Sequence, residues 1–210
     1  NQSAHVAVVD LDVGPKDLQQ CADAVMRLRA EYLFGGRCED QIAFRFTSGD
    51  RAAWSEWKAG SRPIVSGREV RWARSAGPDA SRASFRRYLD VVFTYAGSAS
   101  LAREREPVAD PACPQPGDVY IQGGHPGHAV IVVDVAEDAA GERFVLLAQS
   151  YMPAQDIHVL RGEDDISPWR RARASGVLET PEWTFRHEDL RRFCALACDA
   201  AGREAMACAP

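Results

Sequence analysis

Residue types that together carry out nucleophilic amide hydrolysis occur along this chain in the order cysteine, histidine, amide. Cys21 lies near the start of an expected helix, His128 opens an apolar run, and Gln149 and Ser150 end the next apolar run. A thiol becomes a nucleophile when a neighbouring imidazole accepts its proton, and a third polar group must orient that imidazole. The pattern predicts a catalytic group made of Cys21, His128 and either Gln149 or Ser150.

The helix that would carry Cys21 is expected to start near Asp17, because Asp17 and Gln20 have the spacing of a capping box. The peptide dipoles at a helix N-terminus favour a thiolate, and a nearby histidine lowers the thiol pKa further. Gln19 or Gln20 is the candidate donor to an oxyanion. The alternative is an inert Cys21, because it falls on the apolar stripe of this helix and free cysteines are commonly buried.

His128 is expected at the first position of a strand, where the backbone fixes the imidazole and leaves one ring nitrogen facing a cleft. If Asp134 pairs with Phe144 on the following strand, Ser150 lies opposite His128, and a shift of one residue places Gln149 there instead. Either side chain can bond the imidazole. The alternative interpretation is structural, with the histidine and the glutamine bonded to nearby loops.

The candidate substrate-binding residues are Trp57, Arg62 and Tyr151. Other aromatic and basic residues that could line the same groove for a glycan or peptide are Trp54, Trp72, Trp169, Trp183 and Arg71. A non-catalytic glycan- or peptide-binding module on the same scaffold is therefore the first alternative function. In the opposite interpretation most of these aromatic residues are core or loop anchors.

A metal-dependent hydrolase is the second alternative, with His125 and His128 as ligands and His158 or Asp156 as the third. The two histidines sit in a Gly-Pro turn, and no glutamate base stands beside them as it does in a HExxH helix. The main expectation is accordingly a site with no metal and no cofactor.

The helices and strands expected to position these residues indicate an α+β fold. We expect an antiparallel sheet in the C-terminal half, with helices packed on it. Apolar runs that fill both faces of a strand are typical of a buried sheet. We expect a single domain over 1–210 with the following parts: an aromatic-rich insertion over 49–78, a core sheet over 117–160, and a C-terminal helix and tail over 186–210.

Composition limits the function classes. The chain has 210 residues, of which 46% are hydrophobic, so it can bury a core. Its net charge of −5 opposes binding to a phosphate backbone, which argues against nucleic acid as a partner. No run approaches the ~20 apolar residues of a membrane helix. Six cysteines show no paired zinc spacing, and Cys194 and Cys198 are expected on one helix face as free or casually paired thiols.

Over nearly its whole length the chain resembles a bacterial family of domains of unknown function, whose members are often exported or lipid-anchored. The matching segments are QQCADAVMRLRAEYL (19–33), VFTYAG (92–97), GGHPGHAV (123–130), LAQSYMPAQ (147–155) and TPEWTF (180–185). This resemblance implies an extracytoplasmic location, either periplasmic or lipid-anchored.

The stretch from Gly117 to Ser150 also resembles papain-like amidohydrolases of the NlpC and CHAP type, in which a Gly-Asp turn opens one strand and a histidine base begins the next. The resemblance implies a papain-like core and a cysteine-dependent amidohydrolase or peptidase acting on an extracytoplasmic amide such as a cell-wall peptide. The Asp-Cys-Ser-Gly motif of that family is absent. Cys21 must then come from a different helix, Ser84 must replace it, or the fold is catalytically silent.

Overall fold

The computed structural model describes residues 3–163 and 167–193. Within these residues the helices are α1 (Cys21–Gly35), α2 (Trp54–Lys58), α3 (Arg82–Tyr95) and α4 (Ser98–Glu104), with short 3-10 turns η1 (Glu39–Gln41) and η2 (His187–Asp189). The strands are β1 (His5–Val8), β2 (Ala43–Arg45), β3 (Arg51–Ala53), β4 (Ser61–Ser66), β5 (Glu69–Arg74), β6 (Glu106–Pro107), β7 (Val119–Gln122), β8 (His128–Glu137), β9 (Arg143–Gln149), β10 (His158–Leu160), β11 (Arg170–Arg171), β12 (Val177–Glu179), β13 (Thr184–Arg186) and β14 (Leu190–Arg192).

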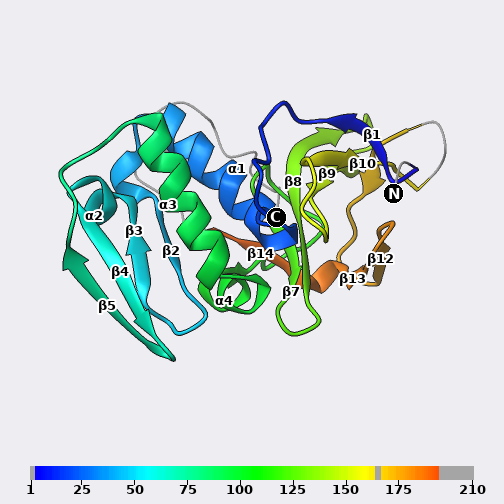
Figure 1. The fold of residues 1–210 in the computed structure, drawn as a ribbon. Coiled ribbons are helices and arrows are strands. Elements are labelled where there is room, and N and C mark those ends of the chain that lie inside the picture. The colour runs from blue at the N-terminus through cyan, green and yellow to red at the C-terminus, as the bar shows by residue number, and fades with distance from the viewer. Residues whose placement is uncertain (1–2, 164–166, 194–210) are drawn as a thin grey trace.

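One large sheet organises the molecule, and its strand order is β1-β10-β9-β8-β7-β14-β6 (Figure 1). Strand β11 pairs with β9 beside this path, and neighbouring strands run antiparallel. Strands β7 to β10 fall inside the expected core sheet, whereas β1 and β14 come from the two ends of the described chain. The α+β class predicted from the sequence is confirmed.

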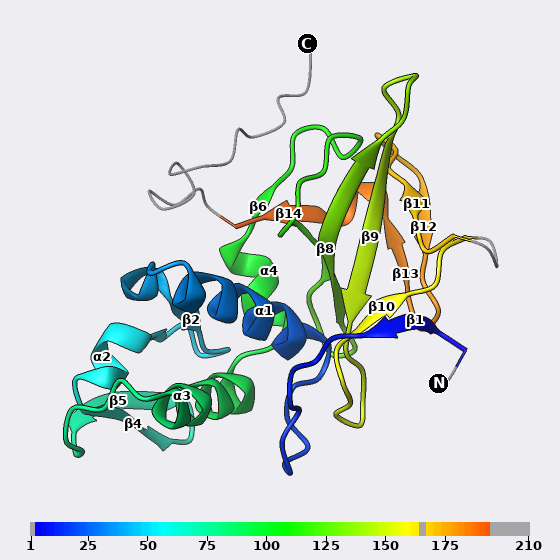
Figure 2. The ribbon, with the colours of Figure 1, turned by 90° about the horizontal axis from the view of Figure 1, so that it is seen from above.

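The two faces of the sheet are covered by different elements (Figure 2). Helices α1 and α4 lie on one face, and the β12–β13 hairpin lies on the other. Along β8 the side chains alternate between two apolar clusters, with Ala129 and Ile131 in the helix-face cluster and Val130 and Val132 in the hairpin-face cluster. Both faces are buried, as the apolar runs predict.

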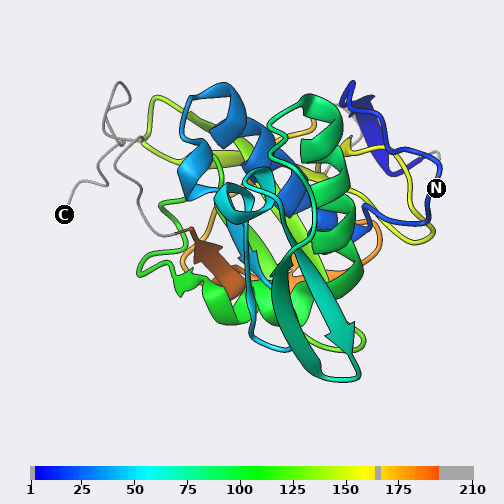
Figure 3. The same cartoon turned by 60° about the vertical axis from the view of Figure 1, so that its left-hand side comes forward.

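The expected 49–78 segment forms β3, α2, β4 and β5 beside α3, in the half of the molecule away from the hairpin β12–β13 (Figure 3). Helix α3 buries Phe85, Leu89 and Val92, whose i, i+4, i+7 spacing puts them on one face of the helix. Trp54 is fully buried and its ring meets Phe85 edge-on at 5.3 Å between centroids. This aromatic segment therefore contributes to a core.

The C-terminal prediction is wrong where the structure describes it. The sequence predicts a C-terminal helix and tail over 186–210, but η2 ends at Asp189 and β14 follows it, because residues 190–192 pair with β7 and β6. Cys194 and Cys198 lie outside the described residues. No helix among the described residues has the length and apolarity needed to cross a membrane.

Asp118 holds β14 in this position. Its carboxylate accepts two hydrogen bonds of 2.7 Å from the Arg192 guanidinium, and its side chain is only 2% exposed. The aspartate of the Gly-Asp turn is therefore a structural clamp between β7 and β14.

Candidate functional site

Helix α1 begins at Cys21, and its N-cap is Gln20, three residues later than the N-cap at Asp17 that the spacing of Asp17 and Gln20 predicts. Gln19 has a φ of 72°, a left-handed conformation that a helical residue does not adopt. The backbone N–H of Gln20 donates to Asp23 Oδ2 at 2.9 Å, so the capping contact is made by Asp23. Asp17 instead accepts a hydrogen bond from the backbone N–H of Ala154. Cys21 is thus the first residue of the helix.

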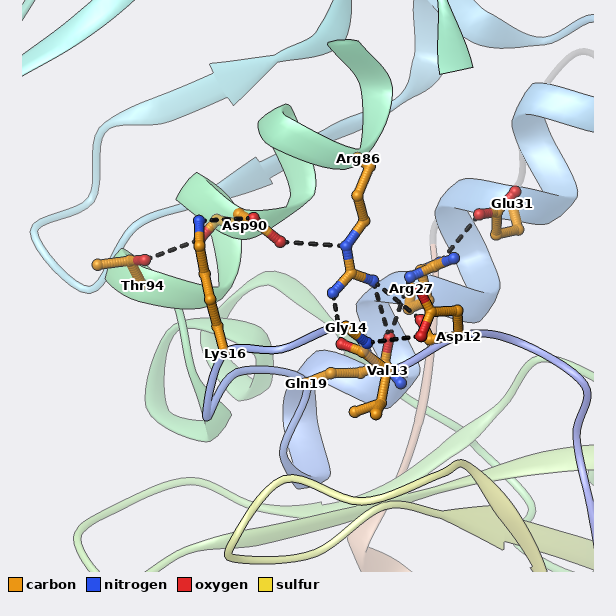
Figure 4. A network of polar contacts seen from close by, with 10 residues as sticks. All are labelled: Asp12, Val13, Gly14, Lys16, Gln19, Arg27, Glu31, Arg86, Asp90 and Thr94. Atoms are coloured by element: carbon orange, nitrogen blue, oxygen red, sulfur yellow. Dashed lines mark hydrogen bonds and ion pairs between the residues drawn. The ribbon is translucent and has the colours of Figure 1, made fainter. Parts of the chain in front are cut away.

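Both the side chain and the backbone of Gln19 accept hydrogen bonds, and Figure 4 shows those of the side chain. Its side-chain Oε1 accepts from Arg27 Nη1 at 3.0 Å and from Arg86 Nη1 at 3.2 Å. Its backbone oxygen accepts from Ser150 Oγ at 2.8 Å. These contacts fix the backbone turn immediately before Cys21. Gln19 Nε2 is buried and has no hydrogen-bond partner among the described residues. Of the two glutamines considered as donors to an oxyanion, Gln19 is therefore the one whose side-chain NH₂ group is unused.

Cys21 is half-buried. Among the described residues it is the free cysteine, since Cys38 and Cys113 each take part in a disulfide bond. Burial raises the pKa of the Cys21 thiol, although backbone N–H groups of Ala22 and Ala129 act in the opposite direction. The lowered thiol pKa that the helix start suggests is therefore outweighed by desolvation. The contact with Ala129 places the sulfur beside the residue that follows His128.

His128 Nε2 lies 2.8 Å from Gln149 Oε1. Neither register considered from the sequence is correct, because Asp134 pairs with Leu146 and not with Phe144 or Arg143. The ladder then shifts between Val132 and Asp134, and beyond that bulge Ile131 pairs with Ala148. In this register Gln149 lies opposite Val130, on the same face of the sheet as His128. The side chains of His128 and Gln149 therefore meet diagonally. The structure thus brings together the predicted base and its predicted amide partner.

Ser150 does not orient the imidazole. It lies next to Gln149 in sequence, and its hydroxyl is 2.8 Å from the backbone oxygen of Gln19 and 2.7 Å from that of Gln155. Ser150 therefore ties the end of β9 to the turn before α1. The expected choice between Gln149 and Ser150 resolves to Gln149 as the partner of His128.

The His128 ring is enclosed by aromatic side chains. Tyr151 meets it edge-on at 5.4 Å between ring centroids, Trp183 lies at 5.6 Å, and Phe185 stacks at 5.9 Å. Burial lowers the pKa of His128, while the hydrogen bond with Gln149 and the charge of Glu182 raise it. The net direction is downward, which favours a neutral imidazole able to accept a proton.

Cys21 and His128 approach this end of the sheet from different sides. Cys21 packs with the cluster on the α1 face, whereas His128 contacts Phe185 of the hairpin face. The element they share is the start of β8, where the backbone N–H of Ala129, the residue after His128, acts on the Cys21 sulfur. The first turn of α1, the first residue of β8 and the last residue of β9 therefore form one candidate site.

The outer end of the Gln149 amide contacts two residues that the sequence does not single out for this role. Gln149 Nε2 donates to Glu182 Oε2 at 2.7 Å and lies 3.4 Å from His158 Nε2. Glu182 precedes β13, and His158 begins β10. The TPEWTF segment carries Glu182 but has no local pattern that would link it to a strand 33 residues earlier.

The three predicted substrate-binding residues do not gather in one place. Tyr151 lies at His128, whereas Trp57 and Arg62 belong to α2 and β4 in the opposite half of the molecule. There the Arg62 guanidinium stacks over the Trp57 ring at 3.9 Å, and both line a hollow of about 320 Å³. Trp57 is only 4% exposed and Trp54 is fully buried, so these two tryptophans belong mainly to the core of this half.

The metal and serine alternatives find little support in the geometry. Across the described part of the chain no three His, Cys, Asp or Glu side chains come together as metal ligands, and His125 is exposed. His128 and His158 are instead bridged by Gln149. Ser84 is buried in the first turn of α3, where its hydroxyl accepts from Trp57 Nε1 at 3.2 Å.

Comparison with known proteins gives one match. The family described as "Domain of unknown function (4846)" matches residues 1–192, which covers the candidate site and every strand of the sheet. No curated protein and no solved structure matches the chain significantly.

Proposed function

The chain belongs to the family described as "Domain of unknown function (4846)", and from the geometry of its site we propose that it is a cysteine-dependent amide hydrolase. Cys21 is the nucleophile, His128 is the general base and acid, and Gln149 orients His128. The observation that carries the proposal is the 2.8 Å contact between His128 and Gln149 at the strand end beside the first residue of α1.

In the proposed reaction the Cys21 thiol proton passes to the neutral His128 imidazole as the sulfur–carbon bond to the substrate carbonyl forms. His128 then gives this proton to the leaving amine as the carbon–nitrogen bond breaks, which produces a thioester on Cys21. Water hydrolyses the thioester to a carboxylic acid and restores the thiol. The raised thiol pKa and the lowered imidazole pKa favour a neutral resting pair over a preformed ion pair.

We propose an extracytoplasmic amide, such as the peptide of a bacterial cell wall, as the substrate. Disulfide bonds persist in oxidising compartments, and Cys38 and Cys113 are both disulfide-bonded. The resemblance of residues 117–150 to NlpC-type strands supports a cell-wall peptide, which offers amide bonds to such a nucleophile. The same reasoning supports a periplasmic or lipid-anchored location.

The test measures amine release from soluble cell-wall peptide fragments by the wild-type protein and by Cys21→Ala, His128→Gln and His125→Gln. We expect no release by Cys21→Ala and a reduction of roughly 100-fold or more by His128→Gln. His125→Gln is the matched control, because His125 is exposed three residues before His128. Release by Cys21→Ala at the wild-type rate, or none by the wild-type protein, would contradict the proposal.

A further inference from the structure

Four polar groups form a continuous row across the end of the sheet. His128 Nε2 contacts Gln149 Oε1 at 2.8 Å, and Gln149 Nε2 contacts Glu182 Oε2 at 2.7 Å and His158 Nε2 at 3.4 Å. His158 Nδ1 contacts the backbone oxygen of Asp156 at 2.9 Å. Gln149 is fully buried, and His128 is 1% exposed, so water does not compete for their contacts.

The chemistry of the outer groups fixes the direction of every hydrogen bond in this row. A carboxylate only accepts, so the Gln149 atom facing Glu182 must be the NH₂ group. The backbone oxygen of Asp156 also only accepts, so His158 carries its proton on Nδ1 and presents a bare Nε2 to the same NH₂ group. Both outer groups therefore require the same orientation of the Gln149 amide.

This orientation determines the tautomer of His128. With its NH₂ group turned toward Glu182, Gln149 presents an oxygen to His128, and that oxygen can only accept. His128 Nε2 must then carry the proton, and Nδ1 keeps the lone pair. An amide has nearly the same shape after a 180° flip, so shape alone does not enforce this arrangement, whereas the acceptor-only Glu182 does.

We infer that Glu182 is a positioning residue, which acts through the Gln149 amide to hold the proton of His128 on Nε2 and leave Nδ1 free as the base. His158 supports the same orientation from β10 through a longer contact. The structural part of this inference stands on the hydrogen-bond row alone, and only its consequence for catalysis rests on the proposed function. Glu182 thereby links the hairpin face of the sheet to the candidate site.

The decisive variant is Glu182→Gln. A glutamine at this position preserves shape but can donate or accept, so the Gln149 amide is no longer forced into one orientation. The measurement is ¹⁵N NMR of the His128 imidazole, which distinguishes the two neutral tautomers. We expect the wild-type protein to show the Nε2–H form predominantly and Glu182→Gln to show a mixture, with the share of the Nδ1–H form rising about tenfold.

Glu179→Gln is the matched control, because Glu179 is exposed on β12 of the same hairpin and carries the same charge. A second variant restores the acceptor by another route. In Gln149→Glu combined with Glu182→Gln, a carboxylate faces His128 and an amide faces outward. This double variant should return His128 to a single Nε2–H form and raise its pKa above that of the wild-type protein.

An unchanged His128 spectrum in Glu182→Gln would overturn the inference, and so would a mixture in the double variant. Amine release distinguishes this outcome from failure of the proposed function. If the wild-type protein releases no amine but the tautomer responds as expected, the hydrogen-bond row stands and the hydrolase proposal fails. If amine release requires Cys21 but the tautomer does not respond, the positioning role fails by itself.

Discussion

His128 and Gln149 touch across the sheet without being direct cross-strand partners. Ile131 pairs with Ala148 below the bulge in β8, and this register leaves a diagonal separation between the two polar residues that the long glutamine side chain spans. The contact depends on the bulge as well as on the residue types. One residue added to or removed from β8 between Val132 and Asp134 would move the imidazole out of reach of the amide.

Cys21 should react slowly with iodoacetamide at pH 6 and progressively faster above its ordinary thiol pKa, because burial raises the pKa of this thiol and alkylation requires the thiolate. The negative charge of Asp23 also raises that pKa, so Asp23→Asn should move the profile to lower pH. Mass spectrometry of tryptic peptides after timed alkylation gives the profile. Rapid modification at pH 6 would show instead that the thiolate is preformed.

Asp23→Asn should also change how stability depends on pH. Burial raises the Asp23 pKa from 3.8 to about 7, so between these values the folded protein binds a proton that the unfolded chain has released. The contribution of Asp23 to stability therefore falls as pH rises through this window. The asparagine of the variant does not ionise, and its side-chain oxygen can still accept from the backbone N–H of Gln20.

Urea unfolding at pH 4.5 and pH 8 tests this expectation. The free energy of unfolding should shift in favour of Asp23→Asn, relative to the wild-type protein, by up to about 3 kcal/mol between the two pH values. Asp17→Asn is the control, because Asp17 is exposed. A difference that stays constant with pH would mean that Asp23 remains ionised in the folded protein.

Two substitutions of Gln19 separate the effect of its backbone conformation on stability from the effect of its side-chain hydrogen bonds. Both Gln19→Ala and Gln19→Gly lose the contacts to Arg27 and Arg86, but only glycine adopts a φ of 72° without strain. Thermal or urea unfolding should therefore find Gln19→Gly more stable than Gln19→Ala by about 1 kcal/mol. The reverse order would indicate that the turn relaxes once the side chain is removed.

Arg192→Ala should destabilise the protein by about 2–4 kcal/mol, because it leaves the buried Asp118 carboxylate without the guanidinium that accounts for two of its hydrogen bonds. Arg191→Ala, one residue earlier on β14, is the control and should cost less than about 1 kcal/mol. Chemical unfolding gives both values. Equal losses for the two variants would exclude a special role for the Asp118–Arg192 clamp.

The sequence predicts those parts of the site that depend on residue type and local periodicity. Continuous apolar runs locate β7, β8 and β9, and the polar residues at their ends include His128 and Gln149. The helix containing Cys21 is also foreseen, although its start is misplaced because nothing in the sequence indicates that Gln19 adopts a left-handed conformation. These features could be predicted because residues that are neighbours in the sequence determine them.

The remaining features depend on contacts between distant segments. The β8–β9 register pairs Asp134 with Leu146 and then shifts at a bulge, and neither pairing considered from the sequence matches it. Glu182 reaches Gln149 only after the β12–β13 hairpin folds onto the sheet. Residue type alone groups Trp57 with Tyr151, whereas the fold places them in opposite halves. Tertiary packing decides such relationships, and local pattern does not contain them.

Strand β14 lies between β7 and β6, so the last described segment completes the interior of the sheet, while β1 from the start of the chain forms its edge beside β10. A ribosome or an export channel delivers the polypeptide from its N-terminus, and the sheet cannot close until residue 192 has emerged. The formation of such sequence-distant pairs makes folding slow. A chain shortened before β14 would expose β7 as an unpaired edge that is prone to aggregation.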